Sequence, residues 1–268
     1  MNRISGAFTR GKAFIPFITG GDPDMETTEK LIYALCRAGA DMIEIGVPFS
    51  DPVAEGPVIE AASERALKNG CTADQLLDVV ARVRGRVSAN TDANIINDIP
   101  IVFMTYYNPV FVYGADRFAR RCRDCGVDGL IVPDLPFEER DELRNPCKAH
   151  GIGLISLIAP TSGDRIDKIA ADSDGFLYCV SSLGVTGERG ELGGEARGMA
   201  ERARRVSDIP CAVGFGVSSP EQAREIAGFA DGVIVGSAIV RIVAEHGRDC
   251  VERVYDFARD MKKAVAGA

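Results

Sequence analysis

Short runs of apolar residues alternate along the chain with segments in which apolar residues recur at helical spacing. The runs are almost continuously apolar, which is typical of parallel strands that are covered on both faces. They lie at residues 13–19, 42–47, 100–106, 129–133, 153–158, 175–180, 211–215 and 232–236. The pattern therefore predicts parallel strands joined by helices.

The segment between the first two runs illustrates the helical spacing. Leu31, Ala34 and Leu35 fall on one face of a helix, and Gly39 marks its end. An internal repetition accompanies the runs, because an aspartate precedes every second one. These residues are Asp41, Asp128, Asp174 and Asp231.

Repeated strand–helix units over about 250 residues predict an α/β protein, a single (β/α)8 TIM barrel domain spanning residues 1–268. A doubly wound open sheet is the main alternative. Such a sheet usually has a GxGxxG motif after its first strand, and the stretch "FITGGDPDM" lacks that spacing. The sequence therefore favours the barrel.

Two connections are unusually long, and extra short helices are expected in the first of them. One follows the second strand in "PFSDPVAEGPVIE", and the other follows the sixth strand in the glycine-rich "SSLGVTGERGELGGE", which we expect to be a loop throughout. Both follow the carboxyl ends of strands, the face at which such barrels hold their active sites. Glycine-rich loops at that face can act as lids.

The composition and charge of the chain exclude some classes of function. A formal net charge of −8, with no basic stripe, argues against nucleic acid. The apolar runs are much shorter than the ~20 residues that cross a bilayer, and the N-terminal stretch has no continuous apolar region, so we expect a cytoplasmic protein. The pair Cys122 and Cys125 is weak evidence for a metal, and we expect none. Neither histidine follows a strand, so the expected proton carriers are carboxylates.

Two carboxylates are candidates for acid–base chemistry. Glu44 lies in the second run between Ile43 and Ile45, where partial desolvation would raise its pKa toward neutrality. A buried structural glutamate is the alternative, although a fully buried, unpaired glutamate is rare. Glu55 follows in a loop rich in proline and glycine, where an acid is usually just solvated, so position alone favours that reading over a catalytic role.

Glycines after the last two strands indicate a phosphate site. Gly216 follows the seventh strand, and Gly236 with Ser237 opens a helix after the eighth. Backbone N–H groups and a helix N-terminus favour an anion there, and barrels that bind phosphate use these two loops. Gly187, in the loop after the sixth strand, could add further amides. Tight turns alone would also explain the glycines.

Apolar and aromatic residues near the strand ends would line a pocket for a flat organic group, although core packing is an equal reading for most of them. They are Phe17, Met104, Tyr106, Ile131, Leu157, Tyr178, Phe215 and Ile234. A phosphate site, two carboxylates and such a pocket predict a substrate with a phosphate tail and an apolar head.

Several motifs together resemble the alpha chains of tryptophan synthase. They are "PFITGGDPD", "IEIGVPFSDPVAEGP", "IVPDLPFEE", "GVTGERG", "GFGVSSPEQ" and "GVIVGSAIV", spread over essentially the whole chain. The resemblance implies a barrel that cleaves indole-3-glycerol phosphate to indole and glyceraldehyde 3-phosphate without a cofactor of its own. It also implies a beta-chain partner that carries pyridoxal phosphate, in an alpha2-beta2 assembly.

The resemblance also implies roles for particular residues. Glu44 would be the catalytic acid–base, and Thr186 would close against the second carboxylate. Gly187, Gly216, Gly236 and Ser237 would hold the phosphate, with Phe17, Tyr178 and Phe215 in the pocket wall. The rim that faces the beta chain would include Asp51, Pro52, Asn108, Asp134 and Pro136.

The sequence departs from the family pattern at one position. The family motif reads Ala-Asp-Gly where this chain has Ala54-Glu55-Gly56. The carboxylate would accept a hydrogen bond from the indole N–H, and glutamate is longer by one methylene. We expect the loop backbone to shift in compensation rather than activity to be lost. A free-standing lyase, a different phosphate-binding barrel and a non-catalytic regulatory barrel remain alternatives.

Overall fold

The computed structural model describes residues 3–85, 98–180, 189–214 and 216–268. Eight parallel strands close into a barrel in sequence order, β1 to β8, with β8 paired to β1. They are β1 (Ala13–Thr19), β2 (Ile43–Gly46), β3 (Ile101–Met104), β4 (Gly129–Ile131), β5 (Gly153–Ile158), β6 (Leu177–Val180), β7 (Cys211–Gly214) and β8 (Gly232–Val235). The predicted (β/α)8 barrel is confirmed.

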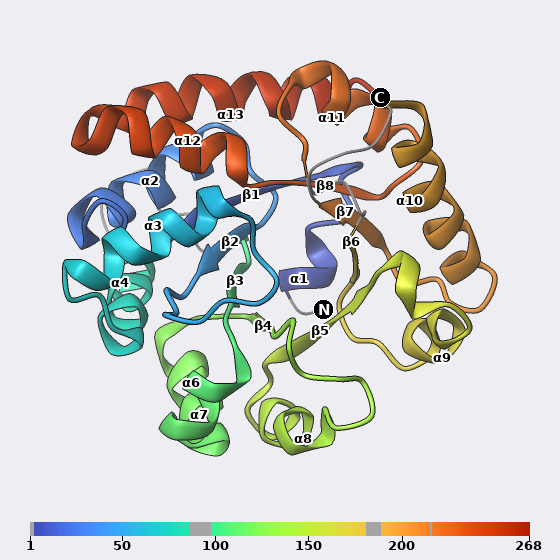
Figure 1. The fold of residues 1–268 in the computed structure, drawn as a ribbon, viewed down its shortest axis with the longest axis horizontal. Helices are drawn as coiled ribbons and strands as arrows, with labels where there is room; N and C mark the ends of the chain where they lie inside the picture. Colours follow the sequence, from blue (N-terminus) through green and yellow to red (C-terminus); the bar gives the residue numbers. More distant parts are fainter. Residues whose placement is uncertain (1–2, 86–97, 181–188, 215) are drawn as a thin grey trace.

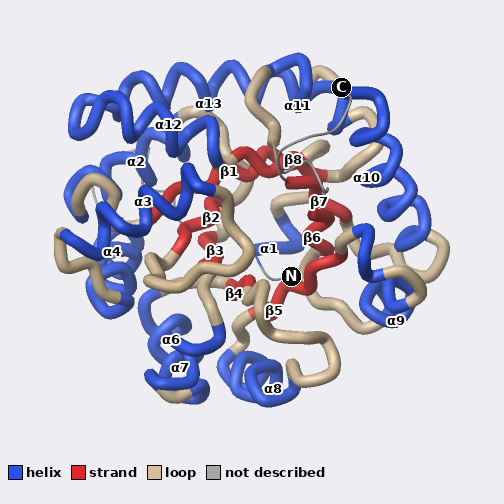
Figure 2. Tube along the Cα trace, viewed as in Figure 1, coloured by secondary structure: helices blue, strands red, loops and turns tan. Residues whose placement is uncertain are grey.

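Helices surround the strands, so that the strand ring lies at the centre of the molecule (Figure 2). The α-helices are α1 (Arg3–Gly6), α2 (Met25–Arg37), α3 (Pro57–Lys68), α4 (Ala73–Gly85), α6 (Tyr107–Tyr113), α7 (Ala115–Cys125), α8 (Asp141–His150), α9 (Arg165–Ala171), α10 (Arg189–Arg204), α11 (Pro220–Ala227), α12 (Ser237–His246) and α13 (Val251–Ala266). Two short 3-10 helices are η1 (Pro160–Ser162) and η2 (Gly247–Cys250).

Successive strand residues face opposite sides, and this divides the core into layers. In β2, Ile43 and Ile45 belong to the apolar layer between strands and helices. A second cluster fills the barrel interior, with Ile15, Val102 and Ile131 among its members. No helix among the described residues is both long and apolar enough to cross a bilayer.

The amino-terminal helix α1 lies over the barrel interior when the molecule is viewed along the barrel (Figure 1). Its Ile4 is fully buried. A Cβ on Gly129, Gly153 or Gly175 would approach Ile4 side-chain atoms to 2.8, 3.1 and 2.9 Å, so glycines near the starts of three strands make room for it. Ile4 thus plugs the N-terminal end of the barrel.

The repeated aspartates have a shared role at this end. The carboxylates of Asp41, Asp128 and Asp231 accept hydrogen bonds from the backbone N–H of Phe14, Ile101 and Cys211, at 2.7, 2.9 and 3.0 Å. Each aspartate therefore ties the start of its own strand to that of an earlier one. Asp174 differs, because its side chain is 59% exposed and lies 4.0 Å from the guanidinium of Arg144.

One expected loop is helical in part. The stretch 181–195 was expected to be a loop because of its glycines, but α10 begins at Arg189. Each glycine inside a helix costs roughly 1 kcal/mol relative to alanine. Burial of Ala196, Met199, Ala200 and Ala203 against the outer faces of neighbouring elements offsets this cost. Residues 181–188 lie outside the described part of the chain.

Candidate active site

Strand alternation turns Glu44 into the barrel. Its neighbours Ile43 and Ile45 pack outward, and Glu44 pairs with Phe17 on β1 and Val102 on β3. The side chain is fully buried, and among the described residues neither carboxyl oxygen has a hydrogen-bond partner. A buried carboxyl without a partner is costly when ionised, so this position favours the protonated form.

A cavity of about 560 Å³ opens at the carboxyl ends of the strands, and Glu44 and Glu55 both line it. Five other predicted pocket residues line the same cavity, together with three of the predicted phosphate-binding residues and Pro136. They are Phe17, Met104, Leu157, Tyr178, Ile234, Gly216, Gly236 and Ser237. The structure thus brings the candidate acid–base groups and the candidate anion site into one cavity.

Burial shifts the pKa of both carboxyls upward. The pKa of Glu44 rises to about 8, first because of burial and second because of the nearby Glu55 charge. The pKa of Glu55 rises to about 7, again chiefly through burial, although its hydrogen bond with Tyr106 opposes the rise. The more deeply buried Glu44 therefore holds its proton more tightly than Glu55, so the pair can supply one protonated and one ionised carboxyl.

Aromatic rings form the wall around Glu44, and glycines leave the space for them. A Cβ on Gly46 would lie 2.6 Å from the Phe17 ring, and one on Gly214 would lie 2.6 Å from the Tyr178 hydroxyl oxygen. Burial, and then Glu44 and Glu55, raise the pKa of Tyr178 far above its usual value. Tyr178 thus stays neutral beside the two carboxyls.

The opposite part of the cavity suits an anion. Gly216 has φ of 75°, a left-handed conformation that glycine adopts without strain. Gly236 precedes the first turn of α12 and Ser237 begins it, so backbone N–H groups and the helix dipole favour negative charge there. Arg241 lies one helical turn further along α12 and also lines the cavity. Sequence reasoning missed this arginine, although its spacing of four from Ser237 was readable.

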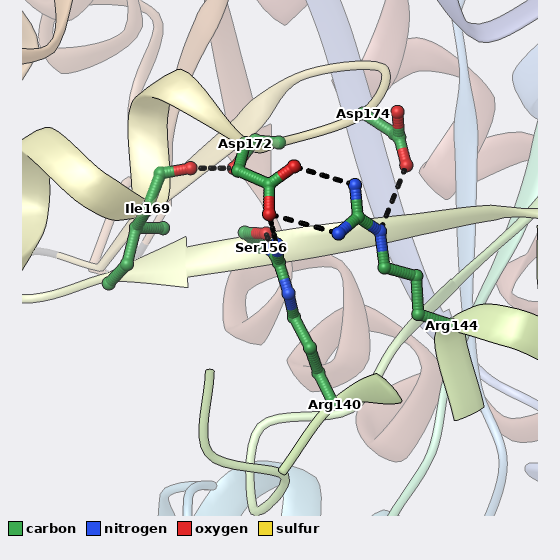
Figure 3. Close-up of polar contacts among 7 residues, drawn as sticks. Arg140, Arg144, Ser156, Ile169, Asp172 and Asp174 are labelled. Carbon is green, nitrogen blue, oxygen red and sulfur yellow. Dashed lines mark hydrogen bonds and ion pairs between the residues drawn. The ribbon is translucent and has the colours of Figure 1, made fainter. Parts of the chain in front are cut away.

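Two further arginines line the cavity but are already paired. Arg140 forms an ion pair with Asp172, which Arg144 also contacts, and donates to Ser156 at 3.4 Å (Figure 3). Arg165 is paired with Glu138 at 2.6 Å. Among the described residues, Arg241 is the lining arginine that has no ion-pair partner.

Two predicted pocket residues do not line the cavity. Ile131 is fully buried in the barrel interior, where it packs against other apolar side chains. Tyr106 lies behind the loop that follows β2, and its hydroxyl accepts hydrogen bonds from the backbone N–H groups of Val53 and Ala54. Both positions follow from packing that sequence alone does not reveal. Thr186, Gly187 and Phe215 lie outside the described residues.

The residues predicted to face a partner lie on the same rim as the cavity. Asp51 and Pro52 belong to the loop after β2, Asn108 to α6, and Asp134 and Pro136 to the loop after β4. Apart from the partly buried Pro52, all of these are exposed. The backbone N–H of Tyr107 donates to Asp134 at 2.9 Å, which joins the loops after β3 and β4.

The cysteines and acidic side chains provide no further candidate site among the described residues. All eight cysteines are free, and Cys122 and Cys125 are buried. Within the described ranges, no group of three or more His, Cys, Asp or Glu side chains is arranged to hold a metal ion.

The chain is a (β/α)8-barrel protein. Its two candidate carboxylates line a cavity at the carboxyl ends of the strands, where barrels of this fold hold their active sites. Residues 7–266 match the family model described as tryptophan synthase alpha chain. The chain therefore belongs to the tryptophan synthase alpha chain family, and it is an enzyme subunit.

Individual relatives agree with the family match. The tryptophan synthase alpha chain of Lacticaseibacillus casei is 45% identical over 99% of this chain and 96% of its own length. That of Halalkalibacterium halodurans is 48% identical over 91% of this chain and 89% of its own. The crystal structure of tryptophan synthase subunit alpha from Legionella pneumophila has a TM-score of 0.87 at 36% identity, covering 100% of both chains.

Proposed function

We propose that the chain, as one barrel domain over residues 1–268, cleaves indole-3-glycerol phosphate to indole and glyceraldehyde 3-phosphate. The observation that carries this proposal is the buried, unpaired Glu44 carboxyl, with a pKa raised to about 8, in the cavity that Gly236 and Ser237 also line. A protonated carboxylic acid is what the first step of this cleavage requires.

The reaction begins with the phosphate held by the backbone N–H groups at Gly216, Gly236 and Ser237. Glu44 gives its proton to C3 of the indole ring, and positive charge develops at the ring nitrogen. The ionised Glu55 accepts the indole N–H hydrogen bond and stabilises that charge.

The Glu44 carboxylate then takes the proton of the glycerol hydroxyl that neighbours the ring. The oxygen lone pair forms the aldehyde carbonyl, and the bond from indole C3 to the glycerol carbon breaks. Its electrons return to the ring, which restores neutral indole. Glu44 is protonated again, so the cycle closes without an external acid.

The partner is part of the same proposal. The exposed rim with Asp51, Asn108 and Asp134 would bind a beta chain in an alpha2-beta2 assembly, and that chain would use pyridoxal phosphate to convert indole to tryptophan. This chain would need no cofactor of its own. We propose that it acts in the cytoplasm.

The test is indole release from indole-3-glycerol phosphate by the native chain and by Glu44→Gln, each with and without a beta chain. Native turnover that the beta chain enhances, and that Glu44→Gln abolishes in both conditions, supports the proposal. Turnover that survives in Glu44→Gln would remove Glu44 as the proton donor. Absence of native turnover in both conditions would indicate a regulatory barrel.

A further inference from the structure

Tyr106 connects the end of β3 to the loop that carries Glu55. Its hydroxyl oxygen accepts the backbone N–H of Val53 at 3.2 Å and that of Ala54 at 3.0 Å. Its ring stacks on Phe49, with centroids 5.1 Å apart, and the residue is 2% exposed. Among the described residues, these two bonds are the ones that tie backbone atoms of residues 51–55 to another element.

The same hydroxyl also acts on the carboxyl of Glu55, whose pKa it lowers. A phenol has one proton to donate and two lone pairs to accept with. The two backbone N–H groups occupy the lone pairs, so the proton remains available to the neighbouring Glu55 carboxyl, whose pKa the hydroxyl lowers. Burial raises the pKa of Tyr106 to about 12, so the phenol keeps this proton throughout the physiological range.

These contacts act on Glu55 in two ways. The backbone bonds hold the two residues just before it, and the neutral hydroxyl favours the ionised form of its carboxyl. Tyr106 does not line the cavity, so it would act on a substrate through Glu55 and not by contact. The side chain of Val53, in the same loop, is 78% exposed, so packing of that side chain contributes little to holding the loop in place.

We propose that Tyr106 is a positioning residue that sets the place and the ionisation of Glu55 in the cavity. The inference rests on the proposed function. It also offers a physical account of the glutamate where the family pattern has aspartate. A displacement of about 1 Å can cost on the order of a hundredfold in rate, and the two hydrogen bonds that the hydroxyl accepts restrain the backbone that carries the longer side chain.

Tyr106→Phe tests the proposal because it keeps the ring and removes the hydroxyl. Without the donated hydrogen bond the ionised form of Glu55 is less stable, so its pKa rises further above about 7. We expect kcat/KM for indole release to fall by about tenfold to hundredfold, and the acid limb of the pH profile to move to higher pH.

The other groups that act on Glu55 stay in place in this variant. Among the described residues they are Glu44 from β2, Glu60 from α3 and Tyr178 from β6. A shift of the acid limb would therefore report the lost Tyr106 hydroxyl.

Tyr107→Phe is the matched control. Its hydroxyl donates to Glu142 at 2.7 Å on the surface, so the variant loses a tyrosine hydrogen bond one residue away that does not reach Glu55. We expect its pH profile to equal that of the native chain. A merely structural Tyr106 would give a lower melting temperature with an unmoved acid limb, and that result would overturn the proposal.

A double-mutant cycle adds an independent readout. In a Glu55→Gln background, Tyr106→Phe should change kcat/KM by less than about threefold, because the carboxylate it positions is already gone. Equal losses in both backgrounds would contradict the positioning role. Both backgrounds keep Glu44, and the proposed function is tested separately by Glu44→Gln, so failure of the Tyr106 role is distinguished from failure of the function.

Discussion

The two ends of the barrel treat buried acids in opposite ways. At the N-terminal end, Asp128 accepts a backbone N–H and pairs with Arg3 and Arg84 at 2.8 and 2.9 Å. At the other end, Glu44 is more deeply buried and has neither kind of partner among the described residues. The same functional group therefore stabilises the fold where it is paired, whereas an unpaired, buried carboxyl favours its protonated form, as the proposed proton donor requires.

This contrast assigns stability to one end and chemistry to the other. Paired aspartates fix the starts of strands, and a rigid barrel then holds the unpaired glutamate at its far end. Changing the paired aspartates should lower stability and spare catalysis, whereas changing Glu44 should abolish most activity and alter stability only through its ionisation.

Glu44→Gln should have the largest effect on activity. General acid–base catalysis contributes about 10²–10⁴-fold, so we expect indole release to fall by about a thousandfold. The substitution should also change how the free energy of unfolding depends on pH. Because the pKa of Glu44 is about 8 in the folded chain against an ordinary 4.5, the folded state binds more protons between these values, and native stability falls as pH rises through this window.

Glutamine cannot ionise, so the variant should lose that component of the pH dependence. Urea unfolding at pH 6 and pH 9 would measure it, with the native chain as reference. An equal loss of stability from pH 6 to pH 9 in both proteins would contradict a buried, ionising Glu44.

Asp128→Asn should have the largest effect on stability. Asparagine can still accept the backbone N–H of Ile101, but it removes the negative charge that lies 2.9 Å from the Arg84 side chain, which is 10% exposed. Breaking a buried pair in this way should lower the free energy of unfolding by about 3 kcal/mol, measured by urea denaturation, while kcat stays unchanged.

Asp124→Asn is the control for that variant. Asp124 is 48% exposed and pairs with Arg123 on the surface, so we expect a change of about 0.5 kcal/mol or less. If Asp128→Asn lowered kcat at a temperature where the chain stays folded, the separation of the two ends would be wrong.

Glu55→Ala should reduce kcat by about a hundredfold, because the carboxylate that stabilises charge on the indole ring is lost. Ionised Glu55 requires a pH above its pKa of about 7, and protonated Glu44 requires a pH below about 8. The native pH profile should therefore be a bell with limbs near these values, and its acid limb should disappear in Glu55→Ala.

Glu55→Asp is the conservative comparison, since it keeps the charge and shortens the side chain by one methylene. We expect its activity to lie between those of the native chain and Glu55→Ala. Full activity in the alanine variant would exclude Glu55 from the reaction.

Arg241→Gln should have the smallest effect. The arginine lies at the anion side of the cavity, so its loss should raise KM for the phosphate substrate by about threefold to tenfold and leave kcat unchanged. The difference should shrink at high ionic strength, since salt screens an exposed charge. Arg120→Gln, an exposed arginine on α7, removes the same charge elsewhere and should leave KM unaltered.

Sequence reasoning located the strands well because continuous apolar runs are specific to covered parallel strands. The third run was too long at its carboxyl end, since β3 ends at Met104 and the apolar Tyr106 serves a loop. Asp174 precedes a strand as the other repeated aspartates do, but its side chain is exposed. Spacing along the chain does not show which carboxylate reaches a backbone N–H.

The site could be predicted in part for a similar reason. An acid inside an apolar strand is a local signal, and Glu44 was found by it. The pairing of Arg140 with Asp172, 32 residues away, depends on contacts that the fold creates, so sequence did not separate it from the unpaired Arg241. The position of Tyr106 behind the loop depends on tertiary contacts in the same way.

The Ile4 plug has a consequence for molecular traffic. With the N-terminal end of the barrel filled, a small neutral product of the proposed reaction at Glu44 would leave through the opening at the carboxyl ends of the strands, by which the substrate enters. A protein bound over that opening would receive the product directly. The filled N-terminal end alone would therefore give the product one direction of exit.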